Sequence, residues 1–312
     1  MPESPHVILI LGVTASGKSA VAHEVAQRLG GEIICVDSMT IYRGMDIGTA
    51  KPTPAEQAAV PHHLLDLVDP CDSFNVARFV EIADAAVQDI ASRGRPIIAV
   101  GGTMLYVKCF YEGIFEGPGA RPEIREAIRA RAEQIGLEAL HAELAVVDPA
   151  AAARIHRNDI RRIERALEVF QLTGKPISAH QQQWDASQIR RPDWRWTLVG
   201  LRREREFENR RINERVRRMV AGGLIDEVRR MFDDPRGVGQ QASQAVGYAE
   251  LLAHFRGDIT LDDAIERIKI NSRHLAKQQR TWLKRLLTVQ WIDADSDDVV
   301  GQICTMPSSR LP

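Results

Sequence analysis

Cysteine, aromatic residues and long apolar runs are all scarce in this sequence of 312 residues. The four cysteines, Cys35, Cys71, Cys109 and Cys304, include no pair with the spacing of a metal site or a redox motif. Cys35 and Cys109 lie in apolar runs, so we expect them to be buried and reduced, which suits the cytoplasm. No apolar run approaches the roughly 18 residues of a membrane span, and no basic leader precedes the first one. We therefore expect a cytoplasmic protein without membrane attachment.

The formal net charge is also small, at −1, so the molecule as a whole is not an obvious binder of polyanions. The charge is unevenly distributed, however. Residues 202–218 hold eight arginines and four glutamates, and residues 267–285 hold seven basic residues and no acid. Local basic faces of this kind can bind a phosphate backbone although the total charge is near zero. With 44% hydrophobic residues, the chain is long enough for one large domain or two.

What the sequence does hold is a phosphate-binding loop at residues 12–19, which fits the pattern G-x-x-x-x-G-K-[ST]. An apolar run precedes it and a helical stretch follows it, as this motif requires. Its glycines let backbone N–H groups point inward, and the helix adds the positive end of its dipole. The loop consists of Gly12, Val13, Thr14, Ala15, Ser16, Gly17, Lys18 and Ser19. The alternative is a Gly-rich turn with a chance Lys-Ser; the motif indicates phosphate or diphosphate and does not specify ATP.

Two polar residues follow other apolar runs that we expect to be strands of the same sheet. Asp37 comes directly after residues 32–36, and Thr103 follows a Gly-Gly turn after residues 97–100. Because α/β sheets bind ligands at the carboxyl ends of their strands, both side chains fit a site there. Asp37 fits a general base or a ligand of metal-bound water, and a turn or N-cap Asp is the structural alternative. Thr103 can offer a hydroxyl to an amine or a phosphate.

Alternating strand-like and helical runs predict an α/β fold, with a P-loop NTPase-like parallel sheet flanked by helices. The expected catalytic core is residues 1–113 and 197–312. From residue 114 to 196 the alternation disappears and the composition shifts to Ala, Arg and Glu, so we expect a helical insertion domain. The expected strands are 7–11, 32–36, 64–68, 97–100, 197–201 and 289–292. The expected helices are 20–29, 75–93, 104–111, 122–135, 137–146, 150–154, 159–172, 205–221, 224–232, 249–255 and 260–287.

The remaining segments give weaker indications. Residues 41–54 show no helical or strand period, which predicts a long loop near the site. His62 and His63 would face opposite ways on a strand, which argues against a shared metal ion. The tail from residue 296 is polar, and we expect it to fray. Three tryptophans are interpreted as packing residues, with stacking on a base as the alternative: Trp184, Trp194 and Trp196.

Arginine pairs four residues apart mark one face of each of two expected helices. Arg211 and Arg215 form the first pair, and their planar, permanently charged guanidinium groups suit a diphosphate clamp. Arg161 and Arg165 form the second pair, for which a solvated charged face is the usual explanation.

Several stretches together resemble one family. Besides the phosphate-binding loop they are residues 37–38 with 41–52, 101–106, 158–165, 211–215, 245–248 and 275–282. The sequence resembles the tRNA dimethylallyltransferases (isopentenyl-tRNA transferases) from the first strand to about residue 287. The long loop and the Leu-Ala-Lys-x-Gln segment beginning at residue 275 are far more specific than the phosphate-binding loop.

The resemblance implies transfer of a dimethylallyl group from dimethylallyl diphosphate to N6 of the adenosine immediately 3′ of the anticodon, in tRNAs that read codons starting with U. The products would be N6-(dimethylallyl)adenosine and diphosphate. A channel through the core would admit the flipped base from one end and the diphosphate from the other, while the insertion holds the anticodon stem. Mg²⁺ would be the cofactor, and tRNA and dimethylallyl diphosphate the partners. A monomer suffices for this chemistry.

The resemblance also implies roles for single residues. Asp37 would accept the N6 proton, Thr103 would orient the base or the diphosphate, and Arg215 with Arg211 behind it would clamp the diphosphate. The loop backbone and Lys18 would hold the same diphosphate, and Ser19 would coordinate Mg²⁺. The implied tRNA contacts are Asp37, Ser38, Met39, Thr40, Thr103, Arg125, Arg161, Arg162, Ile163, Glu164, Arg165, Gln244, Ala245, Val246, Gly247, Tyr248, Ala249, Lys277, Gln278, Gln279, Arg280, Thr281, Trp282, Leu283 and Lys284.

The sequence departs from the family pattern at two of these places. Val13 stands where the family often has Pro, which changes only the entry to the loop. Thr40 stands where Gln is more usual, so the base-reading contact there is open. The zinc-finger extension of some eukaryotic relatives is absent from this sequence, and we expect a compact, bacterial-type enzyme.

Two other functions fit part of the pattern. A small-molecule ATP-dependent kinase would explain the phosphate-binding loop and Asp37, but not the basic helices or the long loop. An RNA-binding module without activity would explain the basic helices. ATP turnover without tRNA would favour the first, and a tRNA that binds without acquiring a prenyl group would favour the second.

Overall fold

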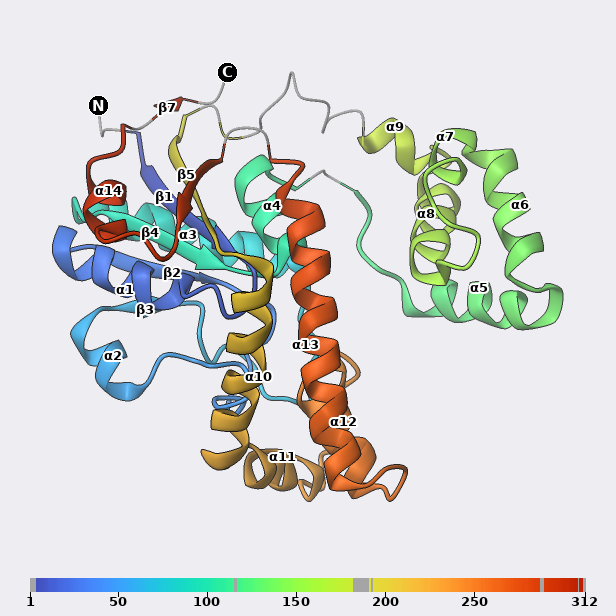
Figure 1. Cartoon of the computed structure of the whole chain (residues 1–312). Coiled ribbons are helices and arrows are strands. Elements are labelled where there is room, and N and C mark those ends of the chain that lie inside the picture. Colours follow the sequence, from blue (N-terminus) through green and yellow to red (C-terminus); the bar gives the residue numbers. More distant parts are fainter. Residues whose placement is uncertain are drawn as a thin grey trace. The chain divides into compact units, whose positions relative to one another are not determined.

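The structure is a computed structural model that describes residues 4–114, 117–181, 191, 193–286, 289–307 and 309–310. The chain forms two compact units (Figure 1). One consists of Met1–Tyr111 with Arg191–Pro312, and the other of Glu112–Arg190. The boundaries expected from the sequence, 113/114 and 196/197, lie close to these limits.

The first unit is built on a parallel sheet. Its strands are β1 (His6–Gly12), β2 (Glu32–Val36), β3 (His62–His63), β4 (Ile97–Gly101), β5 (Arg195–Arg202) and β6 (Gln290–Asp293), in the order β3-β2-β4-β1-β5-β6. These strands pair in parallel, and the short β7 (Ser309–Arg310) pairs antiparallel with β5. Leu11 and Val36 both pair with Gly101, so β1, β2 and β4 end at one edge of the sheet. The parallel α/β fold predicted from the sequence is confirmed.

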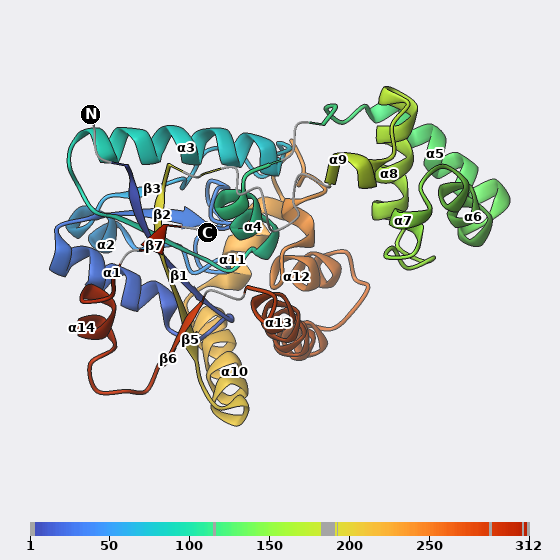
Figure 2. The same ribbon diagram turned by 90° about the horizontal axis from the view of Figure 1, so that it is seen from above.

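Helices cover both faces of this sheet (Figure 2). On one face, α1 (Lys18–Leu29) and α14 (Val299–Cys304) bury the alternate strand residues Ile8, Ile10 and Ile98. On the other lie α3 (Val76–Ser92) and α4 (Met104–Glu112). Each fully buried apolar side chain contributes about 1.5–3 kcal/mol to folding.

The tryptophans at the start of β5 are packing residues. The Phe110 ring lies edge-on to the rings of Trp194 and Trp196, at centroid distances of 6.0 and 5.5 Å. Trp196 is fully buried and Trp194 is 7% exposed, so neither can stack on a base. Trp184 lies outside the described residues.

Two secondary-structure expectations are wrong. Residues 64–68 are not a strand, because Leu64 and Asp66 have φ values of 66° and 53°, which break the extended backbone. The parallel pairing with β2 is made instead by His62–His63. The tail from residue 296 does not fray throughout: the Asp298 carboxylate caps the N-terminus of α14, and Val299 and Ile303 are buried in the core.

Four helices lie beyond the carboxyl edge of the sheet, together with two short helices beside the long loop. The four are α10 (Arg205–Ala221), α11 (Leu224–Phe232), α12 (Tyr248–Phe255) and α13 (Leu261–Leu283); the short ones are α2 (Pro54–Ala59) and the 3₁₀ helix η2 (Ala242–Gln244). Helices α10 and α13 run side by side (Figures 1 and 2). The Arg273 guanidinium of α13 donates to the Asn213 side chain of α10 at 2.6 Å, and Arg280 pairs with Glu208. These contacts tie together the two helices that flank the site.

The second unit is a helical bundle with its own core. Its helices are α5 (Pro122–Ile135), α6 (Leu137–Val147), α7 (Pro149–Ala152), α8 (Ile160–Thr173) and α9 (Ile177–Gln181), of which α9 was not expected from the sequence. Ile128, Leu140 and Ile163 lie in its buried cluster. The fully buried Glu168 carboxylate of α8 is neutralised by Arg125 and Arg165, at 2.9 and 2.7 Å. Burying a carboxylate is tolerated here because it is paired and hydrogen-bonded.

Candidate active site

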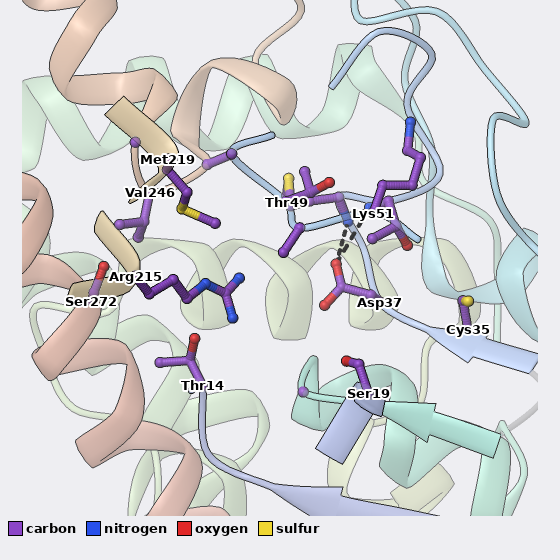
Figure 3. Close-up of a pocket in the computed structure, with 18 of the residues that line it drawn as sticks. Thr14, Ser19, Cys35, Asp37, Thr49, Lys51, Arg215, Met219, Val246 and Ser272 are labelled. Atoms are coloured by element: carbon purple, nitrogen blue, oxygen red, sulfur yellow. Dashed lines mark hydrogen bonds between the residues drawn. The ribbon is translucent and has the colours of Figure 1, made fainter. Parts of the chain in front are cut away.

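A cavity of about 240 Å³ opens at the carboxyl edge of the sheet (Figure 3). Segments far apart in the sequence line it: the loop after β1, Asp37 after β2, the Gly-Gly turn after β4, the long loop, helix α10, residues 245–248 and helix α13. Such an edge is where parallel α/β sheets bind ligands, because loops from adjacent strands meet there. The structure thus brings Lys18, Ser19, Asp37 and Arg215 to one cavity, whereas Thr103 and Arg211 are not among the residues that line it.

The phosphate-binding loop is tightly turned. Ala15 and Gly17 have positive φ values of 62° and 93°, and the Ser16 N–H donates to the Val13 carbonyl at 3.1 Å. A side chain at Gly12 would place Cβ 2.5 Å from the Ser16 hydroxyl, so any larger residue would force Ser16 to shift. Within the part of the chain that the structure describes, no acceptor takes the N–H groups of Ala15, Gly17 or Ser19. Those groups stay available to an anion at the N-terminus of α1.

Lys18 is the cation at the centre of the site. Its ammonium donates to the Val13 carbonyl at 3.3 Å, inside the loop. Removal from water, chiefly, and the nearby Arg215 charge lower the Lys18 pKa to about 8, and the Asp37 charge partly opposes both effects. A bound diphosphate would reverse this shift, since it would face Lys18 with negative charge.

Arginines of α10 extend the positive charge along the outside of the loop. Arg211 donates to the Ala15 carbonyl at 3.1 Å, and Arg218 lies further along the same helix. A second cavity of about 180 Å³ is lined by all three arginines, Arg211, Arg215 and Arg218, and by Lys18 and Ser19. Arg218 was not among the residues expected from the sequence, although it lies one turn beyond Arg215. The helix therefore presents three guanidinium groups to one anion-sized space.

Asp37 lies across the first cavity from Arg215 (Figure 3). One carboxylate oxygen accepts the N–H groups of Met39 and Thr40, at 2.8 and 3.4 Å, so the residue also makes the Asp turn that was the structural alternative. The turn fixes the direction of the carboxylate. Burial, chiefly, and the charge of Asp37 raise the pKa of the nearby Cys35 thiol to about 12. Cys35 and Cys109 are both buried and reduced, as expected.

Thr103 and Ser38 form a hydroxyl pair at the end of the neighbouring strands. The Thr103 Oγ1 accepts the Ser38 N–H at 3.0 Å and lies 3.1 Å from the Ser38 hydroxyl. The approach of the two segments depends on Gly101, because a Cβ there would lie 1.9 Å from the Val36 carbonyl. Thr103 therefore supports the turn that carries Asp37 and Ser38.

Two residues hold the phosphate-binding loop in place, and the sequence did not predict this role for either of them. Gln279 accepts the Thr14 N–H at 2.7 Å, so the expectation that this N–H binds the diphosphate is wrong in this structure. Arg203, just after β5, donates to the Ser16 carbonyl at 3.3 Å and pairs with Asp295. The placement of Arg203 directly after an expected strand, on the same edge as Asp37, was the available signal.

The long loop is held by buried charges. The carboxylate of Glu227, on α11, accepts three successive backbone N–H groups of residues 46–48 at 2.8–3.1 Å and the Tyr248 hydroxyl at 2.5 Å. The Lys51 ammonium lies 2.6 Å from both the Asp46 and the Asp66 carboxylates. Gly48 packs where a Cβ would meet the Tyr248 ring at 2.4 Å. The loop is therefore a rigid wall of the cavity, and a Glu on the apolar face of an amphipathic helix was the signal for it.

The structure corrects several expected tRNA contacts at the level of the side chain. Three of these side chains are buried within the chain and do not line the cavity, so they cannot meet the RNA: Ile163, Glu164 and Leu283. Ala245, Tyr248 and Gln279 are also buried, but they line the cavity. The Arg125 guanidinium donates to the buried Glu168 carboxylate, so its charge is used inside the bundle. The expected stretch 277–284 does include exposed basic residues, Lys277 on α13 and Lys284 just after it.

The residues of this site fit a magnesium ion that takes only one or two oxygens from the protein. Among the described residues, no group of three or more His, Cys, Asp or Glu side chains could hold a metal ion, which includes His62 and His63. Mg²⁺ often keeps several waters and takes only one or two protein oxygens together with phosphates. Ser19 and Asp37 line the same cavity and could supply such oxygens.

Comparison with known proteins decides the family. Residues 40–286 match the IPP transferase family. A tRNA dimethylallyltransferase of Geobacter metallireducens is 47% identical over 291 residues, covering 93% of each chain. The chain belongs to the tRNA dimethylallyltransferase family. Across the described residues, no helix of this family member is long and apolar enough to cross a membrane.

Solved structures of the family show the same fold. The tRNA isopentenylpyrophosphate transferase of Bacillus halodurans is 40% identical, with a TM-score of 0.69 over 96% of this chain and 94% of that one. A eukaryotic dimethylallyltransferase, described as acting on tRNA, is 27% identical with a TM-score of 0.79, over 96% of this chain and 77% of that one. Family membership leaves no support for the kinase interpretation or for the RNA-binding module without activity.

Proposed function

We propose that this chain transfers a dimethylallyl group from dimethylallyl diphosphate to N6 of the adenosine 3′-adjacent to the anticodon, in tRNAs that read codons starting with U. The products are N6-(dimethylallyl)adenosine and diphosphate. The observation that carries this proposal is the placement of Asp37 opposite Arg215, across a cavity that also contains Lys18. A proton acceptor and a cluster of cations thus face each other.

The cations receive the leaving group. Lys18 and Arg215 line one cavity with Ala15, Gly17 and Ser19, whose N–H groups have no acceptor among the described residues. As the carbon–oxygen bond of the allylic diphosphate breaks, its electron pair goes to the diphosphate oxygen, where these donors stabilise the growing charge. Mg²⁺, when bound with Ser19, would supply further charge compensation for the diphosphate.

Asp37 receives the proton. The exocyclic amine of adenine is a weak nucleophile because its lone pair is delocalised, so its attack depends on alignment with the allylic carbon. As the N6–carbon bond forms, one proton leaves N6 for the Asp37 carboxylate, whose direction is fixed by the N–H groups of Met39 and Thr40. The base must leave its stack to reach this cavity.

The tRNA surface is proposed from the exposed residues alone. On α13 these are Lys277, Gln278 and Thr281, with Lys284 just after the helix, and on α8 they include Arg161 and Arg162. Thr40 lines the cavity, with a buried hydroxyl that has no partner among the described residues, which fits a contact with the base. We further propose that the enzyme acts in the cytoplasm as a monomer.

A steady-state assay of diphosphate release tests the proposal. With dimethylallyl diphosphate, Mg²⁺ and an anticodon stem-loop that has adenosine next to the anticodon, release should match the transfer of label to the RNA. A stem-loop with guanosine at that position is the matched control and should give none. Hydrolysis of ATP without RNA, and no transfer, would overturn the proposal.

A further inference from the structure

Gln279 occupies an unusual place on α13. Its neighbours Lys277, Gln278 and Thr281 are exposed, whereas Gln279 is 5% exposed and lies on the opposite face of the helix, with Ala276 and Leu283. A side chain on this buried face cannot reach an RNA that rests on the exposed basic face. The spacing of the three buried residues, three and four apart, follows the period of a helix.

Both ends of the Gln279 carboxamide are used. Its oxygen accepts the Thr14 N–H at 2.7 Å, and its nitrogen donates to the Gly102 carbonyl at 2.8 Å. A backbone N–H can only donate and a carbonyl can only accept, so these partners fix the orientation of the amide. One side chain therefore joins the loop after β1 to the turn after β4.

The surrounding residues make room for this bridge. A Cβ at Gly102 would lie 2.6 Å from the Gln279 nitrogen and 3.5 Å from the Lys18 ammonium. The bridge thus passes beside the cation that faces the diphosphate. Through Gly102 it also holds Thr103, which in turn accepts the Ser38 N–H next to Asp37.

We propose that Gln279 is a positioning residue for the diphosphate site and not an RNA contact. It keeps the phosphate-binding loop and the Gly101–Thr103 turn in register, so that Lys18 and the free N–H groups converge on one anion. Gln279 lines the cavity, but both ends of its carboxamide are bonded to backbone groups, so it acts on the site through Thr14 and Gly102. The inference rests on the proposed function, because it assumes that this site binds the diphosphate of the allylic substrate.

The test compares two substitutions at this position with one elsewhere. Gln279→Met keeps the length of the side chain and removes both hydrogen bonds. Gln279→Glu keeps an acceptor for the Thr14 N–H, loses the donor to Gly102 and adds a negative charge. Gln302→Met, at an exposed position of α14, is the matched control and should behave as the wild type.

The measurements are titrations with inorganic pyrophosphate in the presence of Mg²⁺ and, separately, with an anticodon stem-loop RNA. Loss of two hydrogen bonds predicts about a tenfold weaker Kd for pyrophosphate in Gln279→Met. Gln279→Glu should weaken it further, because its charge repels the anion. Both variants should bind the RNA within about twofold of wild type, and the KM for dimethylallyl diphosphate should rise while the KM for RNA stays constant.

An amide-exchange measurement on the wild-type protein guards against variants that do not fold. Pyrophosphate should slow exchange at Ala15, Gly17 and Ser19 and leave the Thr14 N–H, which Gln279 already holds, protected and unchanged. The proposal is overturned if Gln279→Met weakens RNA binding and spares pyrophosphate, or if the Thr14 N–H exchanges freely until pyrophosphate is added. Failure of the proposed function would appear differently, as wild-type protein that binds both ligands and transfers no dimethylallyl group.

Discussion

Lys18 and Arg215 lie together at the mouth of the phosphate-binding loop, and the charge of Arg215 adds to burial, the larger cause, in lowering the pKa of Lys18. Their mutual repulsion makes the empty site less favourable, and a diphosphate placed between them removes it. Asp37, on the other side of the cavity, offsets only part of this repulsion. The charge arrangement therefore favours a polyanionic ligand on one side and a proton transfer on the other.

The first prediction concerns pH. Because the Lys18 pKa is lowered to about 8, Lys18 of the free enzyme loses its charge as the pH rises through 8. The kcat/KM for dimethylallyl diphosphate should then fall with a midpoint near that pH, since this ratio reports ionisations of the free enzyme. Bound diphosphate stabilises the charged form, so the midpoint in kcat should lie higher. Lys18→Arg should be less active but lose the alkaline decline, and a wild-type ratio that stays flat to pH 10 would contradict this role.

The second prediction separates the two substrates at Arg215. Arg215→Ala removes a charged donor from the diphosphate side of the cavity, so the KM for dimethylallyl diphosphate should rise about 10–100-fold. RNA affinity should change by less than about twofold. Arg210→Ala, which removes an exposed arginine of the same helix that pairs with Glu206, is the control and should change neither. The opposite split, with RNA affinity lost and KM kept, would place Arg215 on the RNA.

The third prediction tests Asp37 as the proton acceptor. Asp37→Asn keeps an oxygen that can accept the N–H groups of Met39 and Thr40, so the turn should survive. The amide cannot take a proton, and the rate of transfer should fall by about 10²–10⁴-fold in single-turnover experiments. Affinities for pyrophosphate and RNA should stay near wild type. A variant that keeps full transfer would remove Asp37 as the proton acceptor.

Stability in acid should depend on Glu32, which is 2% exposed in β2. A hydrogen bond from Arg93, chiefly, and one from His63 hold the Glu32 pKa at about 2, below its ordinary value of 4.5. The stabilisation is therefore complete above about pH 4.5 and is lost as the pH falls towards 2. Glu32→Gln should lower the free energy of unfolding by about 1–3 kcal/mol at pH 7 and flatten its pH dependence in that window. Exposed Glu24→Gln is the control, and equal acid sensitivity of all three proteins would contradict the assignment.

The sheet and the loop after β1 could be predicted from the sequence, because both depend on local patterns of residues. Buried strands read as short apolar runs, and the glycines at 12 and 17 mark a turn that few other residues can make. The prediction of a strand at residues 64–68 failed for the same reason. The run is largely apolar, but the Asp66 carboxylate pairs with the Lys51 ammonium, and the backbone turns there. Such a contact depends on where a separate loop lies, which no local pattern contains.

The residues that support the site were harder to predict than those that face the substrates. Gln279 belongs to a motif that resembles a tRNA-contacting segment, and only the rotation of α13 against the loop shows that its amide points inward. Glu227 and Arg203 likewise act on backbone groups distant in sequence. Hydrogen bonds to distant backbone leave almost no signature in composition or spacing.

The most direct measurement of the central claim is mass spectrometry of nucleosides from tRNA incubated with the purified protein, dimethylallyl diphosphate and Mg²⁺. The account predicts that adenosine next to the anticodon gains the mass of one dimethylallyl group. It also predicts that the group sits on N6 and that Asp37→Asn abolishes the product. Unmodified adenosine in reactions with wild-type protein, or a product attached elsewhere on the RNA, would contradict it.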